Sequence, residues 1–492
     1  MSPITESYTW CQFTPAFVLV GIAALILMAD AFLPKLDKRV YAVFGAVAAI
    51  ATGCFMLGEP DNLFGFLFGF LACVATGLTL LLAYDYYAVS CDSIAGGDNA
   101  EGYGEFLALP LVACAGIFCL TQAHDLVMLF VSLEVLTLSS YTLAGYFRRN
   151  QGSVEAGIKY LVLGAMSTGL LVFGAAWYFG MTGTFELDPQ VAQVALQGSA
   201  IGAPAIAGGF LMAVAMLFLG AFFKVGAAPM HVWIPDVYQG APTPTSSFLA
   251  VASKVGGFVV LCTLFAPLSH YMHPEYALCN VLVWIVGLVA AATLLIGNLG
   301  AINQNNAKRL LGYSSIGQAG FIIVFFLGVG EYGIGTRDIN VFSYLLAYAL
   351  ATIPAFYAIA MVRTQRGSEE ISAFRGLAKT NPRTAFLVTV AFASLAGVPL
   401  TIGFIAKLKA FLALIDTMTV LDGLSWLLVI MIICAAAGFY YYFKIIRAMY
   451  WEKPLPEDKP IQVPGITTAV LAICALASII LGTLPLLITS GS

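Results

Sequence analysis

The sequence predicts an all-α polytopic membrane protein with about 14 transmembrane helices and both termini on the outer side. Composition is the first reason. Of the 492 residues, 60% are hydrophobic and only 10% are charged, whereas soluble domains are roughly 45–50% apolar and about 25% charged. A chain with so few charges cannot cover a water-facing surface, so we expect lipid around it. The net charge of -4 gives no indication of a nucleic-acid partner.

Apolar runs of about 20 residues are the second reason, because each can cross a hydrocarbon core of about 30 Å. The predicted spans lie near 14–33, 40–58, 63–83, 104–122, 125–147, 155–180, 205–234, 243–268, 275–299, 307–329, 338–363, 384–415, 423–450 and 464–488. The runs are continuous rather than alternating, which excludes a transmembrane β-barrel.

The basic residues are the third reason, since they fall in alternate loops. With the N-terminus outside, the inner loops receive Lys35, Lys38, Arg39, Arg148, Arg149, Lys308, Arg309, Arg363, Arg366, Arg375, Lys379, Arg383, Lys444, Arg447, Lys453 and Lys459. The outer loops receive only Arg337, and the other lysines lie inside spans. This asymmetry follows the positive-inside rule. No basic residue precedes the first span, so we expect a retained anchor rather than a cleaved signal peptide.

Sequence motifs for cofactors are missing. The 10 cysteines are scattered without CxxC spacing or a nearby histidine cluster, so we expect small buried hydrophobic side chains rather than ligands of an iron–sulfur cluster. The sequence contains neither a P-loop nor a GxGxxG that opens a helix after a strand. We therefore expect no redox centre, nucleotide site or metal in this chain.

Polar interruptions divide the chain into four parts. We expect three N-terminal helices and a loop in 1–103, blocks of about five spans in 104–270 and 271–451, and one last helix in 452–492. The fourth span of each block contains a glycine–proline break and a lysine, in "FFKVGAAPMHVW" and "SLAGVPLTIGFIAKLKAF". Interrupted apolar segments at matching positions of two halves indicate a transporter site.

Three charged residues lie near the middle of predicted spans, where a charge costs about 2.5–3.5 kcal/mol. Glu134 is either a protonated acid bound to a neighbouring helix or an acid that exchanges protons or pairs with a lysine. Lys224 and Lys254 lie too deep to reach the interface easily. Each is either part of a static ion pair or a member of a proton relay, because a buried lysine with a movable carboxylate can hold or release a proton.

Four more residues are candidates. Lys407 follows the second break and has the same two interpretations, whereas Lys409 points to roughly the opposite side of a helix and favours a structural role. Lys159 lies four residues after Glu155, which is typical of a surface pair, with a relay role as the alternative. His231 is either a simple hydrogen-bonding neighbour or a group that exchanges protons near neutral pH.

These residues, in this order, resemble the antiporter-like membrane subunits of respiratory complex I, the bacterial proton-translocating NADH:quinone oxidoreductase, and most of all its subunit N family. The resemblance covers nearly the whole chain. It is carried by "SLEVLTLSSYTLAGYFRRN", "EAGIKYLVLGA", "FFKVGAAPMHVWIPDVYQGAPTPTSSFLAVASKVG", "NQNNAKRLLGYSSIGQAGF" and "AGVPLTIGFIAKLKAF".

The resemblance implies fourteen helices with two inverted five-helix repeats, each containing a broken helix. It assigns the family's glutamate to Glu134, the lysine of the first broken helix to Lys224 and the central lysine to Lys254. The lysine of the second broken helix corresponds to Lys407, the auxiliary lysine to Lys159 and the central histidine to His231. Lys409 departs from the aromatic or apolar residue expected in the family. A sister subunit carries glutamate at the position of Lys407, which favours the subunit N family.

The implied function is proton translocation driven by NADH (or ferredoxin):quinone oxidoreduction. NADH, FMN, iron–sulfur clusters and quinone would bind in partner subunits, and the other membrane subunits and the lipid bilayer would surround this chain. The implied location is a bacterial plasma (inner) membrane. The alternatives are a subunit of a multi-subunit Na⁺/H⁺ antiporter, a subunit of a membrane-bound hydrogenase, and a passive scaffold.

Overall fold

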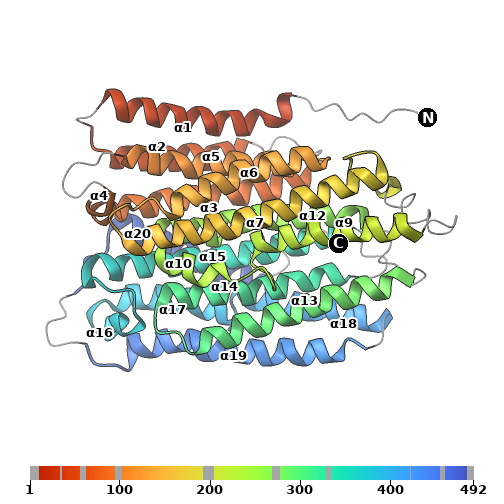
Figure 1. The fold of residues 1–492 in the computed structure, drawn as a ribbon. Coiled ribbons are helices and arrows are strands. Elements are labelled where there is room, and N and C mark those ends of the chain that lie inside the picture. Colours follow the sequence, from red (N-terminus) through yellow and green to blue (C-terminus); the bar gives the residue numbers. More distant parts are fainter. Residues whose placement is uncertain are drawn as a thin grey trace.

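The computed structural model describes residues 10–33, 36–55, 62–94, 102–191, 204–268, 277–328, 334–420, 423–454 and 460–484. In this part of the chain the regular structure is helical (Figure 1), and strand-like pairing is limited to the single contacts Asp125–Glu186 and Asn306–Glu370. The predicted all-α class is confirmed.

The N-terminal helices are α1 (Thr14–Phe32), α2 (Arg39–Phe55), α3 (Leu63–Asp85) and the short α4 (Tyr87–Ile94). The next group comprises α5 (Tyr103–Thr121), α6 (Leu126–Ala144), α7 (Gln151–Thr182), α9 (Pro204–Val225), α10 (Trp233–Gly240), α11 (Thr243–Ala250) and α12 (Ala252–Phe265). The last group comprises α13 (Ala277–Ile302), α14 (Ala307–Ile323), α15 (Ile334–Arg366), α16 (Leu377–Thr380), α17 (Pro382–Ala396), α18 (Ile402–Val420), α19 (Ser425–Tyr450) and α20 (Gly465–Thr483).

Twelve helical segments of the described residues are long and apolar enough to cross a membrane. The predicted span at 40–58 forms α2, a shorter apolar helix, and the predicted span at 384–415 is divided into α17 and α18. The predicted number of about 14 crossings therefore stays a prediction.

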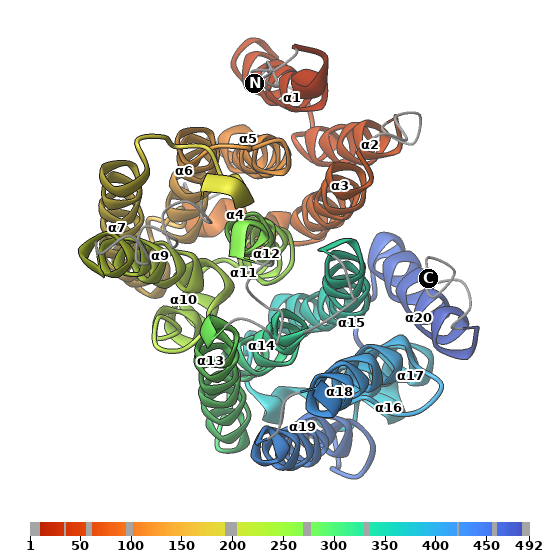
Figure 2. The same cartoon turned by 90° about the vertical axis from the view of Figure 1, so that its right-hand side faces the viewer.

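The helices run side by side in one bundle (Figures 1 and 2), with α11, α12, α14 and α15 in its interior. In the apolar window of Thr243–Leu268, 94% of the residues are buried, whereas in the windows of α1 and α7 the share is 28% each. Peripheral helices thus present apolar side chains outward, as a surrounding of lipid or other membrane subunits requires.

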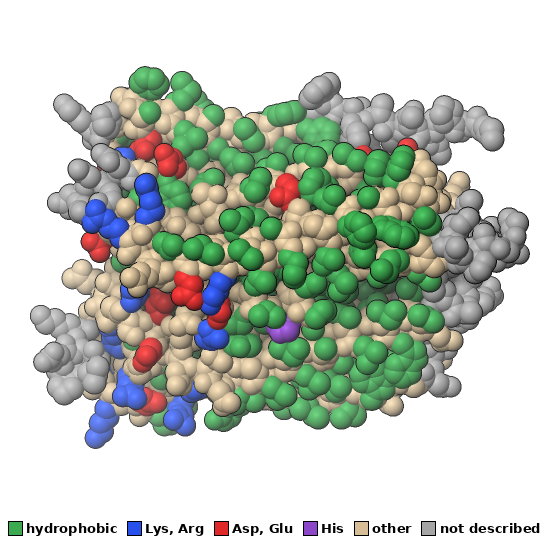
Figure 3. All heavy atoms as spheres, in the orientation of Figure 1, with side chains coloured by type: hydrophobic (Ala, Val, Ile, Leu, Met, Phe, Trp, Pro, Cys, Tyr) green, Lys and Arg blue, Asp and Glu red, His purple; other side chains and the backbone are tan. Residues whose placement is uncertain are grey.

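Lysine and arginine gather at one end of the bundle in Figure 3, the end at which α4, α10 and α16 lie in Figure 1, and hydrophobic side chains cover much of the face between the two ends. Two residues of the predicted inner set, Lys35 and Lys459, lie outside the described residues. The distribution follows the alternation of basic loops in the sequence, and we refer to this end as the basic end.

Candidate functional site

The helices α9 and α17 both end at a glycine, and the same local backbone structure ends each of them. After α9, the Gly226 N–H is bonded to the Phe223 carbonyl (3.2 Å) and the Ala227 N–H to the Phe222 carbonyl (2.9 Å). Gly226 has φ +75, in the left-handed region. This is a Schellman motif, in which glycine supplies a conformation that other L-residues adopt only with strain.

The second break, after α17, repeats this structure. The Gly397 N–H is bonded to the Ser394 carbonyl (3.0 Å), the Val398 N–H to the Ala393 carbonyl (3.0 Å), and Gly397 has φ +86. Both breaks predicted from glycine and proline are thus present, and each ends one helix and starts another within the apolar part of the bundle.

Lys224 lies in the last turn of α9, directly before the first break, and is 3% exposed. Its Nζ donates to the Tyr160 hydroxyl at 3.2 Å and lies 5.9 Å from the centre of the Tyr141 ring. The ammonium group is therefore enclosed by two tyrosines from the neighbouring helices α6 and α7.

Glu134 lies halfway along α6, and two hydroxyl groups hold its carboxylate. Thr168 donates to Oε1 at 2.8 Å and Thr137 to Oε2 at 3.1 Å. Among the described residues, no basic nitrogen lies within 4 Å of this carboxylate, so the structure does not form the expected pair with a lysine. Tyr141, whose ring faces Lys224, lies seven residues after Glu134 on α6.

Lys254 lies in the first turn of α12, behind a local break at Val251 (φ -115, ψ -70) that separates α11 from α12. The lysine is 1% exposed, and its Nζ donates to the Ser315 carbonyl at 2.5 Å. The Tyr348 ring lies 5.4 Å from the same nitrogen. On the other side of Ser315, its Oγ contacts the Tyr238 hydroxyl at 3.4 Å. Lys254 is thus buried at the centre of the bundle, with polar groups on α10 and α14 beside it.

Lys407 lies in α18 but binds the end of α17. Its Nζ donates to the carbonyls of Leu395 (2.9 Å) and Ala396 (2.8 Å), and the residue is 7% exposed. A cation is favourable at this position, because the last carbonyls of a helix lack partners and carry partial negative charge. Lys409 is half-buried on the same helix.

A line of neutral polar side chains leads from the neighbourhood of Lys254 to Lys407. The Gln318 amide donates to the Leu395 carbonyl (3.3 Å), which also accepts from Lys407 (2.9 Å). The same amide donates to the Tyr442 hydroxyl (3.2 Å), and this hydroxyl is hydrogen-bonded to Ser314. Ser314 is the neighbour in sequence of the residue that binds Lys254. Polar groups thus extend from one buried amine to the other, with a step along the backbone between Ser314 and Ser315.

The remaining two candidates lie away from the three buried lysines. Lys159 is 42% exposed in its side chain and pairs with Glu155 (2.7 Å) and with Asp236 (2.8 Å). His231 is half-buried in the turn between α9 and α10, next to Val232, which is 65% exposed. Its Nδ1 is shielded from solvent and has no hydrogen-bond partner among the residues that the structure describes. His231 therefore lies at the periphery of the bundle.

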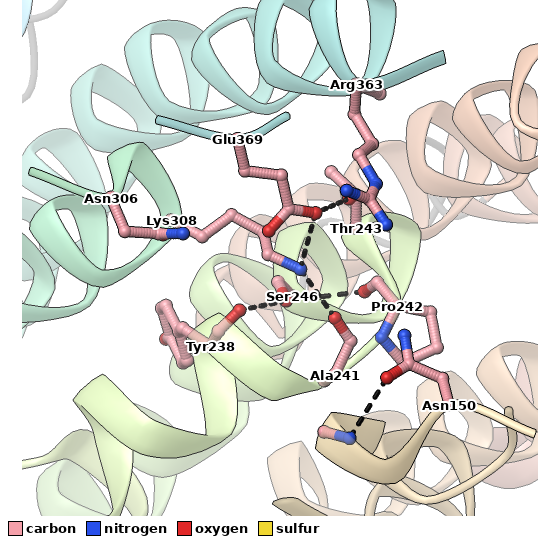
Figure 4. Close-up of polar contacts among 12 residues, drawn as sticks. Asn150, Tyr238, Ala241, Pro242, Thr243, Ser246, Asn306, Lys308, Arg363 and Glu369 are labelled. Carbon is pink, nitrogen blue, oxygen red and sulfur yellow. Dashed lines mark hydrogen bonds and ion pairs between the residues drawn. The ribbon is translucent and has the colours of Figure 1, made fainter. Parts of the chain in front are cut away.

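A polar cavity of about 490 Å³ lies at the basic end, between the start of α7, the end of α10 and the start of α14. Asp236 stands at its wall and binds both Lys159 and, at 2.6 Å, Arg309. Lys308 and Glu369 also line it, and they pair at 3.0 Å. Figure 4 shows the ion pair of Lys308 and Glu369 next to Ala241 and Thr243.

Comparison with known proteins gives the family. Residues 123–437 match the family model described as "NADH:quinone oxidoreductase/Mrp antiporter, TM". NADH-quinone oxidoreductase subunit N of Geobacillus sp. (strain WCH70) is 34% identical over 97% of this chain and 97% of that protein. Subunit N of Acidithiobacillus ferrooxidans is 33% identical over 97% and 95%. The chain belongs to the NADH-quinone oxidoreductase subunit N family. The resemblance inferred from the sequence is confirmed.

Solved structures agree with membership of the subunit N family. A chain of respiratory complex I from Thermus thermophilus with bound aureothin is 28% identical, with a TM-score of 0.75 over 96% of this chain and 97% of that one. A chain of the archaeal membrane-bound sulfane sulfur reductase (22%, TM-score 0.78, 96% and 94% covered) shares the fold. So does one of the Mrp complex from Dietzia sp. DQ12-45-1b (21%, TM-score 0.78, 98% and 51% covered).

Sequence reasoning missed two parts of the site in this subunit N family member. Lys308 was expected in an inner loop, but it belongs to α14 and its side chain is 3% exposed. The pairing of Lys308 with Glu369 joins positions 61 residues apart, and no local pattern reveals it. Gln318 and Tyr442 are neutral, so their presence in apolar runs gave no signal. Only the stretch "GYSSIGQAGF", which is polar for a membrane span, could have drawn attention to α14.

Proposed function

We propose that this chain is a proton-translocating membrane subunit of a respiratory complex I, which couples NADH (or ferredoxin):quinone oxidoreduction in partner subunits to proton movement. The observation that carries the proposal is the burial of Lys224, Lys254 and Lys407, each beside an interruption of a helix. One buried charge in a membrane costs about 2.5–3.5 kcal/mol. Three such charges, two of them near the ends of one line of polar groups, favour transport over a scaffold.

In the proposed route, a proton comes from the basic end to Lys254, passes along Gln318 and Tyr442 to Lys407, and leaves at the opposite end. Glu134 and Lys224 stand beside this route and set its charge state. Glu134 is held by hydroxyls in this structure, so control of Lys224 requires its carboxylate to rotate toward Tyr141. A carboxylate with two positions is the kind of two-state element through which distant redox chemistry can act.

The other two predicted site residues have subordinate roles in this proposal. Lys159 lies at the cavity between Glu155 and Asp236 and would help to hold protons near its mouth. His231 lies in the break after α9, where freed backbone groups attract water, so its imidazole would exchange protons with that water.

We also propose fourteen crossings with two inverted repeats, 104–270 and 271–451, between N-terminal helices (1–103) and a last helix (452–492). The two Schellman breaks support the repeats. So do the paired contacts: Asp125 is the N-cap of α6 and meets Glu186 after α7, while Asn306 is the N-cap of α14 and meets Glu370 after α15. The second contact lies at the basic end. In Figure 1, α1 begins and α20 ends away from that end, in keeping with both termini outside.

Family membership and the apolar side chains on the outer helices suggest what surrounds this chain in the membrane. Exposed apolar side chains on α1, α7 and α19 suit lipid and the neighbouring membrane subunits of complex I. NADH, FMN, iron–sulfur clusters and quinone would reside in partner subunits. The relatives named above are bacterial, which favours a bacterial plasma membrane.

The proposal is tested on the whole complex in proteoliposomes. Lys254→Ala and Lys407→Ala should lower NADH-driven proton transport by roughly tenfold or more, as expected for loss of a proton-transfer group. Lys453→Ala is the matched control, because that lysine is exposed at the basic end. Normal transport by an assembled Lys254→Ala complex would contradict the proposal.

The likeness to a chain of an Mrp complex makes a Na⁺/H⁺ antiporter subunit the second candidate, and it rests on fold alone. Affinity purification of this chain decides between the two. Quinone-site and iron–sulfur proteins should accompany it. Recovery with small antiporter subunits alone would favour the second candidate.

A further inference from the structure

Lys308 joins three elements at the inner face of the bundle. Its Nζ donates to the Ala241 carbonyl at 2.8 Å and pairs with Glu369 Oε1 at 3.0 Å. Ala241 is the C-cap of α10, Lys308 belongs to the first turn of α14, and Glu369 lies in the loop after α15. A backbone bond from Ala307 to the Glu369 carbonyl (2.9 Å) holds that loop in place. Figure 4 shows the three groups meeting in one place.

This ion pair lies in the lining of the polar cavity, and α14 connects it to the surroundings of Lys254. On the cavity side, Glu369 is 13% exposed in its side chain and Lys308 3%. On the interior side, Ser246 donates to the Tyr238 carbonyl at 2.8 Å, and the Tyr238 hydroxyl contacts Ser315, whose carbonyl binds Lys254. Lys308 and Ser315 are seven residues apart on one face of α14, a distance of about 10 Å. Lys308 therefore lines the cavity and shares one helix face with the residue whose carbonyl binds Lys254.

A purely structural role explains only part of the arrangement. An amide or a hydroxyl would satisfy the Ala241 carbonyl without a buried charge. Replacing a buried ion pair by packed apolar side chains is often neutral or stabilising, because both charges lose their water. The carboxylate of Glu370, the next residue, accepts a hydrogen bond from the nearby Ser372 hydroxyl (3.2 Å), and this residue is exposed. Two consecutive glutamates thus differ: Glu370 is exposed, whereas the Glu369 carboxylate pairs with the buried Lys308.

We propose that Glu369 is the carboxylate that takes up protons from the inner cavity, and that its ion pair with Lys308 closes the route to Lys254 between uptake events. The inference rests on the proposed proton transport. The other groups that face the carboxylate are Thr243, which donates to Oε1 at 3.5 Å, together with Arg363 and the Tyr86 hydroxyl across the cavity wall.

The step transfers one proton and no electrons. A proton from cavity water binds a carboxylate oxygen of Glu369, and the neutral acid no longer holds the Lys308 ammonium. The acid then gives its proton, by way of the Tyr238 and Ser315 hydroxyls, to the neutral amine of Lys254. Glu369 is again a carboxylate and pairs with Lys308, which remains bound to Ala241 throughout.

The test compares Glu369→Gln, Glu369→Asp, Glu370→Gln and Lys254→Ala in the complete complex in proteoliposomes. Each variant is assayed for assembly, for NADH:quinone turnover and for NADH-driven proton transport. Glu369→Gln keeps the size and hydrogen bonds of the side chain but cannot bind a proton. It should lower proton transport as strongly as Lys254→Ala, by roughly tenfold or more. Glu369→Asp should retain most transport, and Glu370→Gln should match the unmodified complex.

Different outcomes refute different claims. If Lys254→Ala abolishes transport and Glu369→Gln leaves it intact, the role of Glu369 is wrong and the proposed function stands. If Glu370→Gln is as damaging as Glu369→Gln, the loop is structural and the inference fails. Normal transport in Lys254→Ala refutes the proposed function itself. Should Glu369→Gln not assemble, Lys308→Gln replaces it, since the amide still caps Ala241. Transport must then fall, because the carboxylate has lost the partner that resets it, and unchanged transport overturns the inference.

Discussion

The break after α9 allows a quantitative test of how the sequence positions Lys224. Gly226 has φ +75, and a Cβ added there would lie 1.9 Å from Ile234 Cδ1. A left-handed conformation costs an L-residue roughly 1–2 kcal/mol, and forcing an extra carbon into a packed site typically costs about 1–3 kcal/mol. Gly226→Ala should therefore lower the free energy of unfolding by about 2–5 kcal/mol.

Two further variants separate these contributions. Gly183 has φ +76, but an added Cβ would meet nothing within 4 Å, so Gly183→Ala should cost only about 1–2 kcal/mol. Ile234→Val removes the Cδ1 atom itself at a cost of about 0.5–1.5 kcal/mol. In the double variant Gly226→Ala/Ile234→Val, the steric part should disappear and the conformational part should remain, so the two changes are not additive.

The free energies are measured on the full chain in mixed micelles by denaturant titration followed by tryptophan fluorescence, and proton transport is measured on the complex. Lys224 lies two residues before Gly226, so Gly226→Ala should also impair transport, and the double variant should recover part of it. Equal destabilisation by Gly226→Ala and Gly183→Ala would refute the contact with Ile234. Failure of Ile234→Val to relieve the first variant would refute it independently.

Two other expectations concern the buried polar groups. Tyr442→Phe removes the hydroxyl between Gln318 and Ser314, which leaves buried partners unpaired at a cost of about 1–3 kcal/mol. Proton transport should fall. Tyr357→Phe is the control, because the Tyr357 hydroxyl donates to the Leu78 carbonyl away from this line, and equal effects of the two variants would count against the proposed connection. Lys407→Met leaves the Ala396 carbonyl without the lysine, while the Leu395 carbonyl keeps the Gln318 amide, and the variant should destabilise the chain by about 1–3 kcal/mol. Lys407→Gln keeps a donor and should stay stable yet inactive. A denaturant titration in mixed micelles and the transport assay measure the two effects, and active Lys407→Gln would contradict the role of this lysine.

The sequence predicts those features of the fold that a lipid environment imposes on any chain. Apolar length predicts helices because lipid offers backbone groups no other partner, and the all-α fold with both breaks is as expected. The burial of Lys224, Lys254 and Lys407 was also predicted, since a lysine in the middle of an apolar run has nowhere to reach.

Contacts between distant segments could not be predicted in the same way. Lys308 stands at the first turn of α14, and sequence alone assigned it to an inner loop, because its burial depends on α10 and on Glu369 packing over it. Glu134 illustrates a second limit. The sequence predicts that Glu134 lies near the middle of its span. Its hydroxyl partner Thr168 comes from α7, and the rotation of each helix about its axis decides which side chains meet.

The same Schellman motif ends α9 and α17, but the lysine beside each break has different hydrogen-bond partners. At the second break, Lys407 turns back and binds two carbonyls at the end of α17, so its ammonium is held by fixed dipoles of the helix. At the first break, Trp233 Nε1 donates to the Phe223 carbonyl (2.9 Å), which lies one position earlier, relative to the glycine, than the carbonyls that Lys407 binds. Within the described part of the chain, the Lys224 ammonium contacts the Tyr160 hydroxyl and the rings of Tyr141 and Tyr160. The Lys224 ammonium is thus held by fewer fixed backbone dipoles than that of Lys407. This difference fits the proposed division of roles, in which Lys224 controls the charge state and Lys407 carries the proton.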